Sequence, residues 1–168
     1  MHLEKNRIIR AAREEDIEVI MAVLDAARCI MRSSGNPSQW PDGYPTREMI
    51  EKDIAGGFGY VIADSQTTVG YFAFIPSPDP TYSIIYDGAW IDNRSSYHVI
   101  HRIASFPHAH GIFASMMEFC LQRDKNLRID THRDNKIMQH NLQKHGFSYC
   151  GIIHLLNGDE RLAYQRIP

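Results

Sequence analysis

Residues 97–113 read YHVIHRIASFPHAHGIF. The first part, Tyr97–Ser105, is mostly apolar and predicts a strand, and Pro107 cannot continue a strand ladder. After Gly111 apolar side chains recur at helical spacing to about Arg123, which predicts a helix. A strand, a turn with glycine and a helix start place unpaired backbone N–H groups and the positive end of the helix dipole at one point, which attracts phosphate. A simple packing turn is the alternative explanation of this segment.

The rest of the chain continues the alternation of strands and helices. Upstream, the acidic residues 14–16 favour a helix start, and Thr46 can cap a second helix. Downstream, Asp134 can cap a helix that Gly146 stops, and residues 157–159 can form a hairpin turn. The other expected strands are Ile8–Ala12, Tyr60–Ala63, Thr68–Phe74, Leu127–Thr131, Phe147–Leu155 and Arg161–Ile167, with a weaker strand or loop at Tyr82–Trp90.

This order of elements predicts an α/β (α+β) fold. We expect a mixed, mainly antiparallel twisted sheet of about six to seven strands flanked by four helices. The strand-helix-strand unit of residues 97–131 is expected to be a right-handed crossover that places two parallel strands near each other. The chain has 168 residues, of which 43% are hydrophobic and 23% charged. That length and composition suit a single domain over residues 1–168 and exclude disorder and a coiled coil.

Charge and cysteine usage exclude several classes of protein. Eighteen basic and twenty acidic residues leave no positive excess, so general nucleic-acid binding lacks its usual driving force. No apolar run reaches the roughly 18 residues that span a bilayer, and residues 1–10 lack the hydrophobic stretch of a signal peptide. Cys29, Cys120 and Cys150 form no CxxC pair and are expected to be reduced thiols. We therefore expect a cytoplasmic protein with no membrane, nucleic-acid or metal partner.

A second motif lies at residues 135–147, which read NKIMQHNLQKHGF. Taken with residues 97–113 and the strand order, it resembles the GNAT superfamily of N-acetyltransferases over nearly the whole chain, Ile8–Ile167. In that family the phosphate-binding turn reads Arg/Gln-x-x-Gly-x-Gly/Ala, and a later helix reads Asn-x-x-Ala-x-x-x-Tyr-x-x-x-Gly-Phe. The residues at the positions of the first motif are His108, Gly111 and Phe113. Those at the positions of the second are Asn135, Met138, Leu142, Gly146 and Phe147.

Three departures from the family pattern bear on cofactor binding and catalysis. His108 stands where arginine or glutamine is usual, and Phe113 stands where a small residue is usual. Leu142 replaces a tyrosine that protonates the departing thiolate in many members. A thiol with an ordinary pKa of about 8.5 can leave with modest acid help or none. The departures keep open an alternative, a non-catalytic acyl-CoA-binding or interaction module on the same scaffold.

The resemblance implies an acyltransferase that moves the acetyl group of acetyl-CoA to a primary amine of a small molecule or a protein. Transfer is direct, within a ternary complex, because holding thioester and amine together makes their reaction effectively unimolecular. A homodimer would be ordinary for this scaffold. The positions that the resemblance assigns to acetyl-CoA binding are Ile103, Ala104, Ser105, His110, Gly111, Ile112, Phe113, Ala114, Ser115 and Asn135.

His101 is the candidate catalytic base. It occupies a strand position where many members of the family carry a glutamate, and an unperturbed histidine pKa of about 6.5 suits the role. A hydrogen-bonded histidine on a half-buried strand is the alternative. His132 is a weaker candidate for the same role, and Asn135 can equally be a helix cap.

The acceptor is expected to lie among loop aromatics and the end of the neighbouring strand. Trp40, Tyr44 and Trp90 lie in predicted loops that flank the acceptor cleft in the family, and Thr131 ends the strand beside it. Loop residues folded onto the edge of the core are the alternative for the aromatics. Asp87 and Asp92 are candidates for holding an ammonium group, or are solvated carboxylates.

Overall fold

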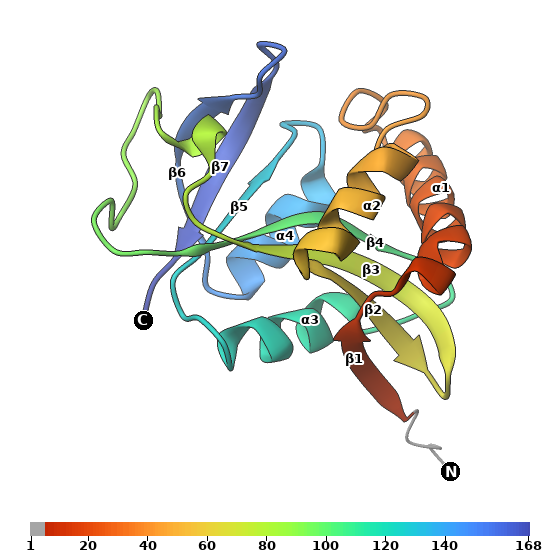
Figure 1. The fold of residues 1–168 in the computed structure, drawn as a ribbon. Helices are drawn as coiled ribbons and strands as arrows, with labels where there is room; N and C mark the ends of the chain where they lie inside the picture. Colours follow the sequence, from red (N-terminus) through yellow and green to blue (C-terminus); the bar gives the residue numbers. More distant parts are fainter. Residues whose placement is uncertain (1–5) are drawn as a thin grey trace.

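The computed structural model describes residues 6–168 and contains one seven-stranded sheet between two layers of helices (Figure 1). The strands lie in the order β1-β2-β3-β4-β5-β7-β6. Their bounds, with those of the helices, are β1 (Arg7–Ala11), α1 (Ile17–Ser33), α2 (Arg47–Gly56), β2 (Gly59–Asp64), β3 (Thr67–Pro76), β4 (His98–Ser105), α3 (Ile112–Leu121), β5 (Leu127–Thr131), α4 (Lys136–Lys144), β6 (Ser148–His154) and β7 (Glu160–Arg166).

The predicted fold class and order of elements are confirmed. Among the strand pairs formed by residues 6–168, only β4 and β5 run parallel, and the other neighbours are antiparallel. This is the pair that the strand-helix-strand unit of residues 97–131 predicts. None of the helices described in residues 6–168 is long and apolar enough to cross a membrane.

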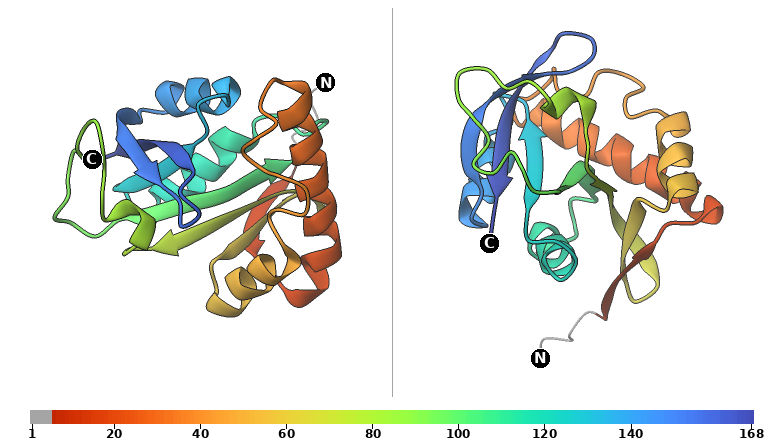
Figure 2. Two further views of the ribbon diagram at one scale, coloured as in Figure 1. Left: turned by 90° about the horizontal axis from the view of Figure 1, so that it is seen from above. Right: turned by 60° about the vertical axis from the view of Figure 1, so that its left-hand side comes forward.

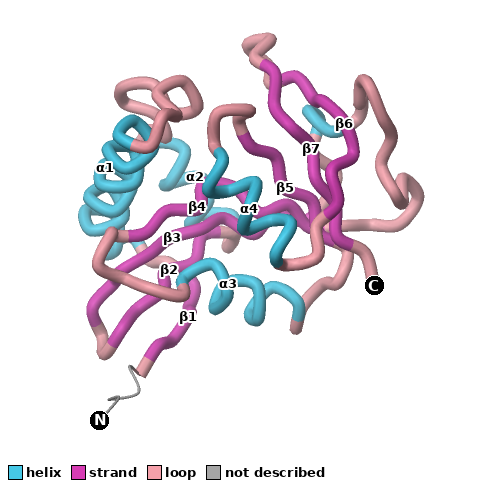
Figure 3. Tube along the Cα trace, turned by 180° about the vertical axis from the view of Figure 1, so that it is seen from behind, coloured by secondary structure: helices cyan, strands magenta, loops and turns pink. Residues whose placement is uncertain are grey.

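Two helices cover each face of the sheet, and each pair is held by an apolar core (Figures 2 and 3). Buried residues of α1 and α2, such as Leu24 and Ile50, pack against Val61 of β2 on one face. On the other face, Met116 of α3 and Leu142 of α4 are fully buried against the sheet. The β-strands therefore carry apolar side chains on both faces, as buried central strands do.

The parallel pair β4–β5 separates soon after it begins. The two strands pair only at His98 with Leu127 and at Val99 with Arg128. Each strand then continues with its outer neighbour, β4 with β3 as far as Ser105 and β5 with β7 as far as Thr131. The backbone groups on the facing edges of β4 and β5 beyond these residues have no ladder partner in the sheet. They are available to other hydrogen-bonding groups.

A β-bulge in β4 sets which side chains face which way. Ala73 of β3 pairs with His101 and Tyr71 pairs with Ala104, so an extra residue is accommodated in β4. Arg102 has a φ of 55°, which is uncommon for a residue other than glycine. Because of the extra residue, His101 and Arg102 both point away from the α3 face, instead of alternating as in a regular strand.

One local expectation is wrong, and one open alternative is decided. The cap of α4 is Asn135, whose side-chain oxygen accepts the N–H of Met138 at 3.0 Å, and not Asp134. Residues 82–90 form a loop that covers the edge of β6, with a single bridge between Tyr86 and Ile152. Of the strand and the loop that the sequence leaves open for these residues, the loop is observed, and it packs closely against β6. A Cβ at Gly88 would lie 1.9 Å from the carbonyl oxygen of Cys150.

Leu142 provides a test of the core between α4 and the sheet. Replacing this fully buried leucine by alanine should lower the free energy of unfolding by about 2–5 kcal/mol, because the cavity left behind is only partly closed. Ile137 on the same helix is 57% exposed, and Ile137→Ala should change the free energy of unfolding by less than about 0.5 kcal/mol. Urea unfolding of both variants measures the difference, and equal effects would contradict the assignment of Leu142 to the core.

Candidate active site between two separating strands

Two adjoining cavities lie where β4 and β5 separate. The first, of about 430 Å³, lies at the N-terminus of α3 and is called the helix cavity here. The second, of about 480 Å³, surrounds His101 and is called the histidine cavity. Four residues line both of them: Met31, Ile103, Asn135 and Met138. A ligand in one cavity can therefore contact a ligand in the other.

The first turn of α3 opens into the helix cavity. Gly111 precedes the helix with a φ of 70° and provides no side-chain cap, so the N–H groups of Ile112, Phe113 and Ala114 have no capping side chain. A Cβ at Gly111 would meet only the Arg7 guanidinium, at 3.6 Å, so the space beside this glycine is open to a ligand. Free N–H groups at the positive end of a helix are suited to an anion such as phosphate.

Most of the residues predicted to bind the cofactor line this cavity. They come from the end of β4, the start of α3 and the start of α4. The eight that line it are Ile103, Ala104, Ser105, Gly111, Ile112, Phe113, Ala114 and Asn135. The side chains of Lys136 and Lys144 also line it and add positive charge, which was not expected from the motifs. The charge and the donors of the helix cavity fit a phosphorylated ligand.

His110 and Ser115 lie outside the helix cavity, contrary to expectation. Both are held by Arg7 of β1, which donates to the carbonyl oxygen of His110 at 2.7 Å and to the Ser115 hydroxyl at 3.3 Å. Arg7 also pairs with both carboxylate oxygens of Asp64, at 2.7 and 2.9 Å. Ser115 therefore accepts a hydrogen bond from the protein, and Arg7 anchors the turn before α3.

Phe113 occupies part of the helix cavity that a small residue would leave open. Its ring packs against the ring of His145 at the end of α4, with the centroids 4.9 Å apart. Asn141 and His145 line the cavity from α4, whereas Leu142 lies in the core and lines neither cavity. The position that carries tyrosine in many members of the family is thus part of the apolar core in this chain.

In the histidine cavity, His101 lies between two carboxylates. Its Nε2 is 3.0 Å from Oδ2 of Asp79, and its Nδ1 is 3.8 Å from Oδ2 of Asp130. The Tyr82 hydroxyl donates to the same Asp130 oxygen at 2.6 Å. Burial and the Asp130 carboxylate hold the pKa of Tyr82 well above its usual value, so this hydroxyl stays protonated. The side chain of Asp130 is thereby fixed beside the imidazole.

Asp79 determines which nitrogen of His101 carries the proton. Burial raises the pKa of Asp79, but hydrogen bonds from His101 and Thr81 outweigh this effect and lower it to about 2. Asp79 is therefore ionised at neutral pH and can only accept, so Nε2 of His101 must be the donor. A neutral His101 then presents an unprotonated Nδ1, the form that a general base needs.

The predicted acceptor residues divide into two groups. Trp40, Tyr44 and Thr131 line the histidine cavity. Trp90 does not: its ring is buried in the core, its Nε1 donates to the carbonyl oxygen of Tyr82 at 3.0 Å, and the Arg128 guanidinium lies over it at 3.9 Å. Trp90 therefore packs into the core, which is the alternative that the sequence leaves open for the loop aromatics.

The other candidates lie outside both cavities. Asp87 and Asp92 line neither one, and the Asp92 carboxylate accepts the backbone N–H groups of Arg94 and Ser95. His132 also lines neither cavity, and its Nδ1 accepts the N–H of Asp134 at 3.0 Å. Among residues 6–168, no group of three or more histidine, cysteine, aspartate or glutamate side chains could hold a metal ion.

Several residues of the histidine cavity were missed by the sequence analysis. Asp79 comes from a proline-rich loop, and only the fold brings it to His101. Asp130 could have been found from the sequence, because it is an acidic residue within the otherwise buried strand β5. Arg102 was also missed. Its guanidinium forms an ion pair with both carboxylate oxygens of Asp53, at 2.8 and 2.6 Å.

Comparison with known structures agrees with this arrangement. The chain is similar to the crystal structure of a GNAT-family acetyltransferase from Streptococcus agalactiae 2603, with 34% identity over 96% of this chain and 95% of that one and a TM-score of 0.87. The chain belongs to the GNAT family of acetyltransferases. The resemblance carried by residues 97–113 and 135–147 is thereby confirmed, and acetyl transfer is the activity that the family supports.

More distant members share the fold of this GNAT protein. A GNAT-family acetyltransferase from Listeria monocytogenes 4b F2365 is 20% identical, with a TM-score of 0.65 over 95% of this chain and 94% of that one. One from Bacillus cereus ATCC 10987 is 17% identical, with a TM-score of 0.60 over 96% and 98% of the two chains. No protein-family model and no curated protein sequence matches the chain.

The Asp79–His101 contact should contribute to stability in a pH-dependent way. The pKa of Asp79 is lower in the folded protein than the value of about 3.9 in an unfolded chain, so its contribution is present above pH 4 and is lost as the pH falls toward 2. Wild type should exceed Asp79→Asn by about 1 kcal/mol in free energy of unfolding at pH 5, after discounting for solvent screening. Urea unfolding between pH 5 and 2 should show this gap closing. A gap that stays constant would contradict the assignment.

Proposed function

We propose that this GNAT protein transfers an acetyl group from acetyl-CoA directly to a primary amine within a ternary complex. The observation that carries the proposal is the junction of the two cavities between β4 and β5, with an open helix N-terminus in one and His101 in the other. Acetyl-CoA supplies an acetyl thioester, and its transfer forms a carbon–nitrogen bond, breaks the carbon–sulfur bond and releases one proton from the amine.

The helix cavity is the proposed binding site for acetyl-CoA. The N–H groups of Ile112, Phe113 and Ala114 bind phosphate oxygens, and Lys136 and Lys144 neutralise their charge. The end of β4, Ile103–Ser105, lines the same cavity along an edge that β5 has left without ladder partners. Amide groups of the cofactor can complete hydrogen bonds on that edge.

The acceptor amine is proposed to bind in the histidine cavity, where His101 removes its proton. Nδ1 of His101 accepts the proton while Asp79 holds the Nε2–H, and the nearby Asp130 carboxylate stabilises the imidazolium that results. Tyr82 keeps Asp130 in place. These are the roles that a base, an orienting group and a charge-stabilising group play in general-base catalysis.

Departure of the thiol does not require a dedicated acid in this proposal. Leu142 is buried and apolar, and no tyrosine within residues 6–168 lines the helix cavity. A thiol with an ordinary pKa near 8.5 is a sufficiently good leaving group to depart as the thiolate. A leucine at position 142, in place of the tyrosine that many members carry, is therefore compatible with catalysis.

Binding of acetyl-CoA is tested at Gly111. Gly111→Val places a branched side chain in the open space beside the first turn of α3 and forces an unfavourable positive φ on valine. The dissociation constant for coenzyme A, measured by calorimetry, should rise at least about tenfold. Gly57→Val is the matched control, because Gly57 has a φ of 77° and also has open space but caps α2 instead. Unchanged binding by the Gly111 variant would contradict the phosphate site.

The base is tested at His101. With a primary-amine acceptor, His101→Gln should lower kcat by about 10²–10⁴-fold and remove the acidic limb of the pH–rate profile, while coenzyme A binding stays unchanged. Thiol release from acetyl-CoA with a panel of primary amines provides the assay. An unaltered rate and pH profile would remove His101 from the mechanism. Tight coenzyme A binding by wild type without turnover of any amine would favour the non-catalytic module instead.

A further inference from the structure

Within residues 6–168, one buried arginine of the histidine cavity has no ion-pair partner. Arg161 of β7 is only 6% exposed and lines this cavity. Its side-chain hydrogen bonds within residues 6–168 go to two backbone carbonyl oxygens, those of Glu160 at 2.9 Å and Gln39 at 3.2 Å. The nearest acidic residue in sequence, Glu160, is paired with Arg133 instead. Arg161 therefore forms no ion pair with an acidic residue of the described part of the protein, Asp159 of the same cavity included.

Two other arginines with largely buried side chains show how this chain accommodates such a charge. Arg102 forms a two-point pair with Asp53. Arg128 lies between the rings of Trp90 and Tyr97, at 3.9 and 3.8 Å from their centroids. Among residues 6–168, no carboxylate forms an ion pair with the Arg161 guanidinium and no aromatic ring stacks on it. A buried charge without a partner is costly, and a ligand that supplies the partner recovers that cost on binding.

The effect of the unpaired charge is visible at a neighbouring residue. Burial lowers the pKa of His132, and the positive charge of Arg161 lowers it further. The Arg161 guanidinium is the cation at this end of the histidine cavity, and the Asp159 carboxylate that also lines the cavity accepts from Asn157. An anionic group is the natural ligand for that end.

Another part of the same cavity is suited to an amine. His101 and the carboxylates of Asp79 and Asp130 lie there. Asp130 of β5 pairs with Ala163 of β7, so Arg161, two residues from Ala163, lies on the same face of the sheet as Asp130. Such diagonal neighbours are about 7–8 Å apart. A small molecule can therefore reach both groups at once.

We infer that the acceptor is a small amine that also carries a carboxylate, which Arg161 binds while the amine lies beside His101. This inference rests on the proposed function and narrows its acceptor from any primary amine to an amino acid or a related amino carboxylate. Guanidinium and carboxylate form planar two-point pairs, which makes a carboxylate the anion that this residue selects.

The wild-type protein provides the first test. Coenzyme A release is measured with α-amino acids and short ω-amino acids, each compared with its primary amide at equal concentrations of free amine. An aminoalkylphosphonate and a diamine complete the panel. The acids should exceed their amides in kcat/KM by about ten- to a hundred-fold, because the amide lacks the charge that pairs with Arg161. Amides or diamines that react as well as the acids would overturn the inference. So would a preference for the phosphonate.

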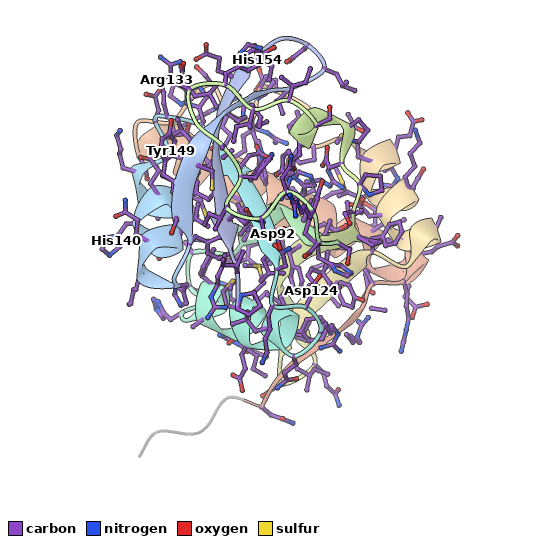
Figure 4. All side chains as sticks on the ribbon, turned by 90° about the vertical axis from the view of Figure 1, so that its left-hand side faces the viewer. Asp92, Asp124, Arg133, His140, Tyr149 and His154 are labelled. Atoms are coloured by element: carbon purple, nitrogen blue, oxygen red, sulfur yellow. The ribbon has the colours of Figure 1, made fainter. Side chains whose placement is uncertain are left out.

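Variants of Arg161 provide the second test. Arg161→Gln should reduce the acid-to-amide ratio at least about tenfold, mainly through KM for the acid, and Arg161→Lys should retain part of the ratio. Arg133→Gln is the control, because Arg133 is an exposed arginine on the outer surface that lines neither cavity (Figure 4). The ratio should be unchanged in this control. An equal fall in both glutamine variants would show a general effect of charge and would overturn the pairing.

The two proposals fail in different ways. If the proposed function is wrong, no acid, amide, phosphonate or diamine releases coenzyme A, and calorimetry shows no binding of acetyl-CoA. If only the acceptor class is wrong, acetyl-CoA binds and amines without an acid group are acetylated. The comparison of acids with amides uses the unaltered protein, so it decides the question even if a substitution at buried Arg161 prevents folding.

Discussion

The loss of backbone pairing between β4 and β5 is the constraint on which the rest of the structure depends. Two residue pairs hold these parallel strands together, and each strand then follows its outer neighbour. The interior of a sheet is normally closed by hydrogen bonds, and here it is open at its centre. The bulge at Arg102 adds to this effect, since it directs His101 and Arg102 to the same face. Both cavities exist because the hydrogen-bond ladder between β4 and β5 ends early.

The distribution of charge within this opening explains how one chain can accommodate two different ligands. Free helix N–H groups and lysines lie on the side of α3, where a phosphorylated ligand fits. On the other side, carboxylates surround His101 and an unpaired guanidinium lies further along β7. Apolar residues such as Met31 and Ile103 form the wall that the cavities share. The charged groups are thereby kept apart, and a reacting pair could meet in surroundings of low polarity.

Much of the fold could be predicted from local patterns, because apolar periodicity, glycine and proline act over a few residues. Leu127–Thr131 was predicted with the bounds observed, and Thr46 caps α2 as expected. The bulge at Arg102 could not be predicted, because it arises from pairing with β3 and leaves no mark in composition. Asp79 and His101 are 22 residues apart, and a loop brings them together. The sequence left two alternatives for Trp90, because an aromatic residue in a loop can pack inward as readily as it can face a ligand.

The contact between Arg7 and the turn before α3 has a consequence for the behaviour of the whole molecule. Arg7 belongs to an edge strand, and its guanidinium donates a hydrogen bond to the carbonyl oxygen of His110. Asp64 of the adjacent strand holds the guanidinium in place. Segments 103 residues apart in the sequence are thus joined beside the helix cavity. Fraying of the outermost strand, the least supported part of any sheet, would loosen this turn and weaken the proposed binding of coenzyme A well before the central core unfolds.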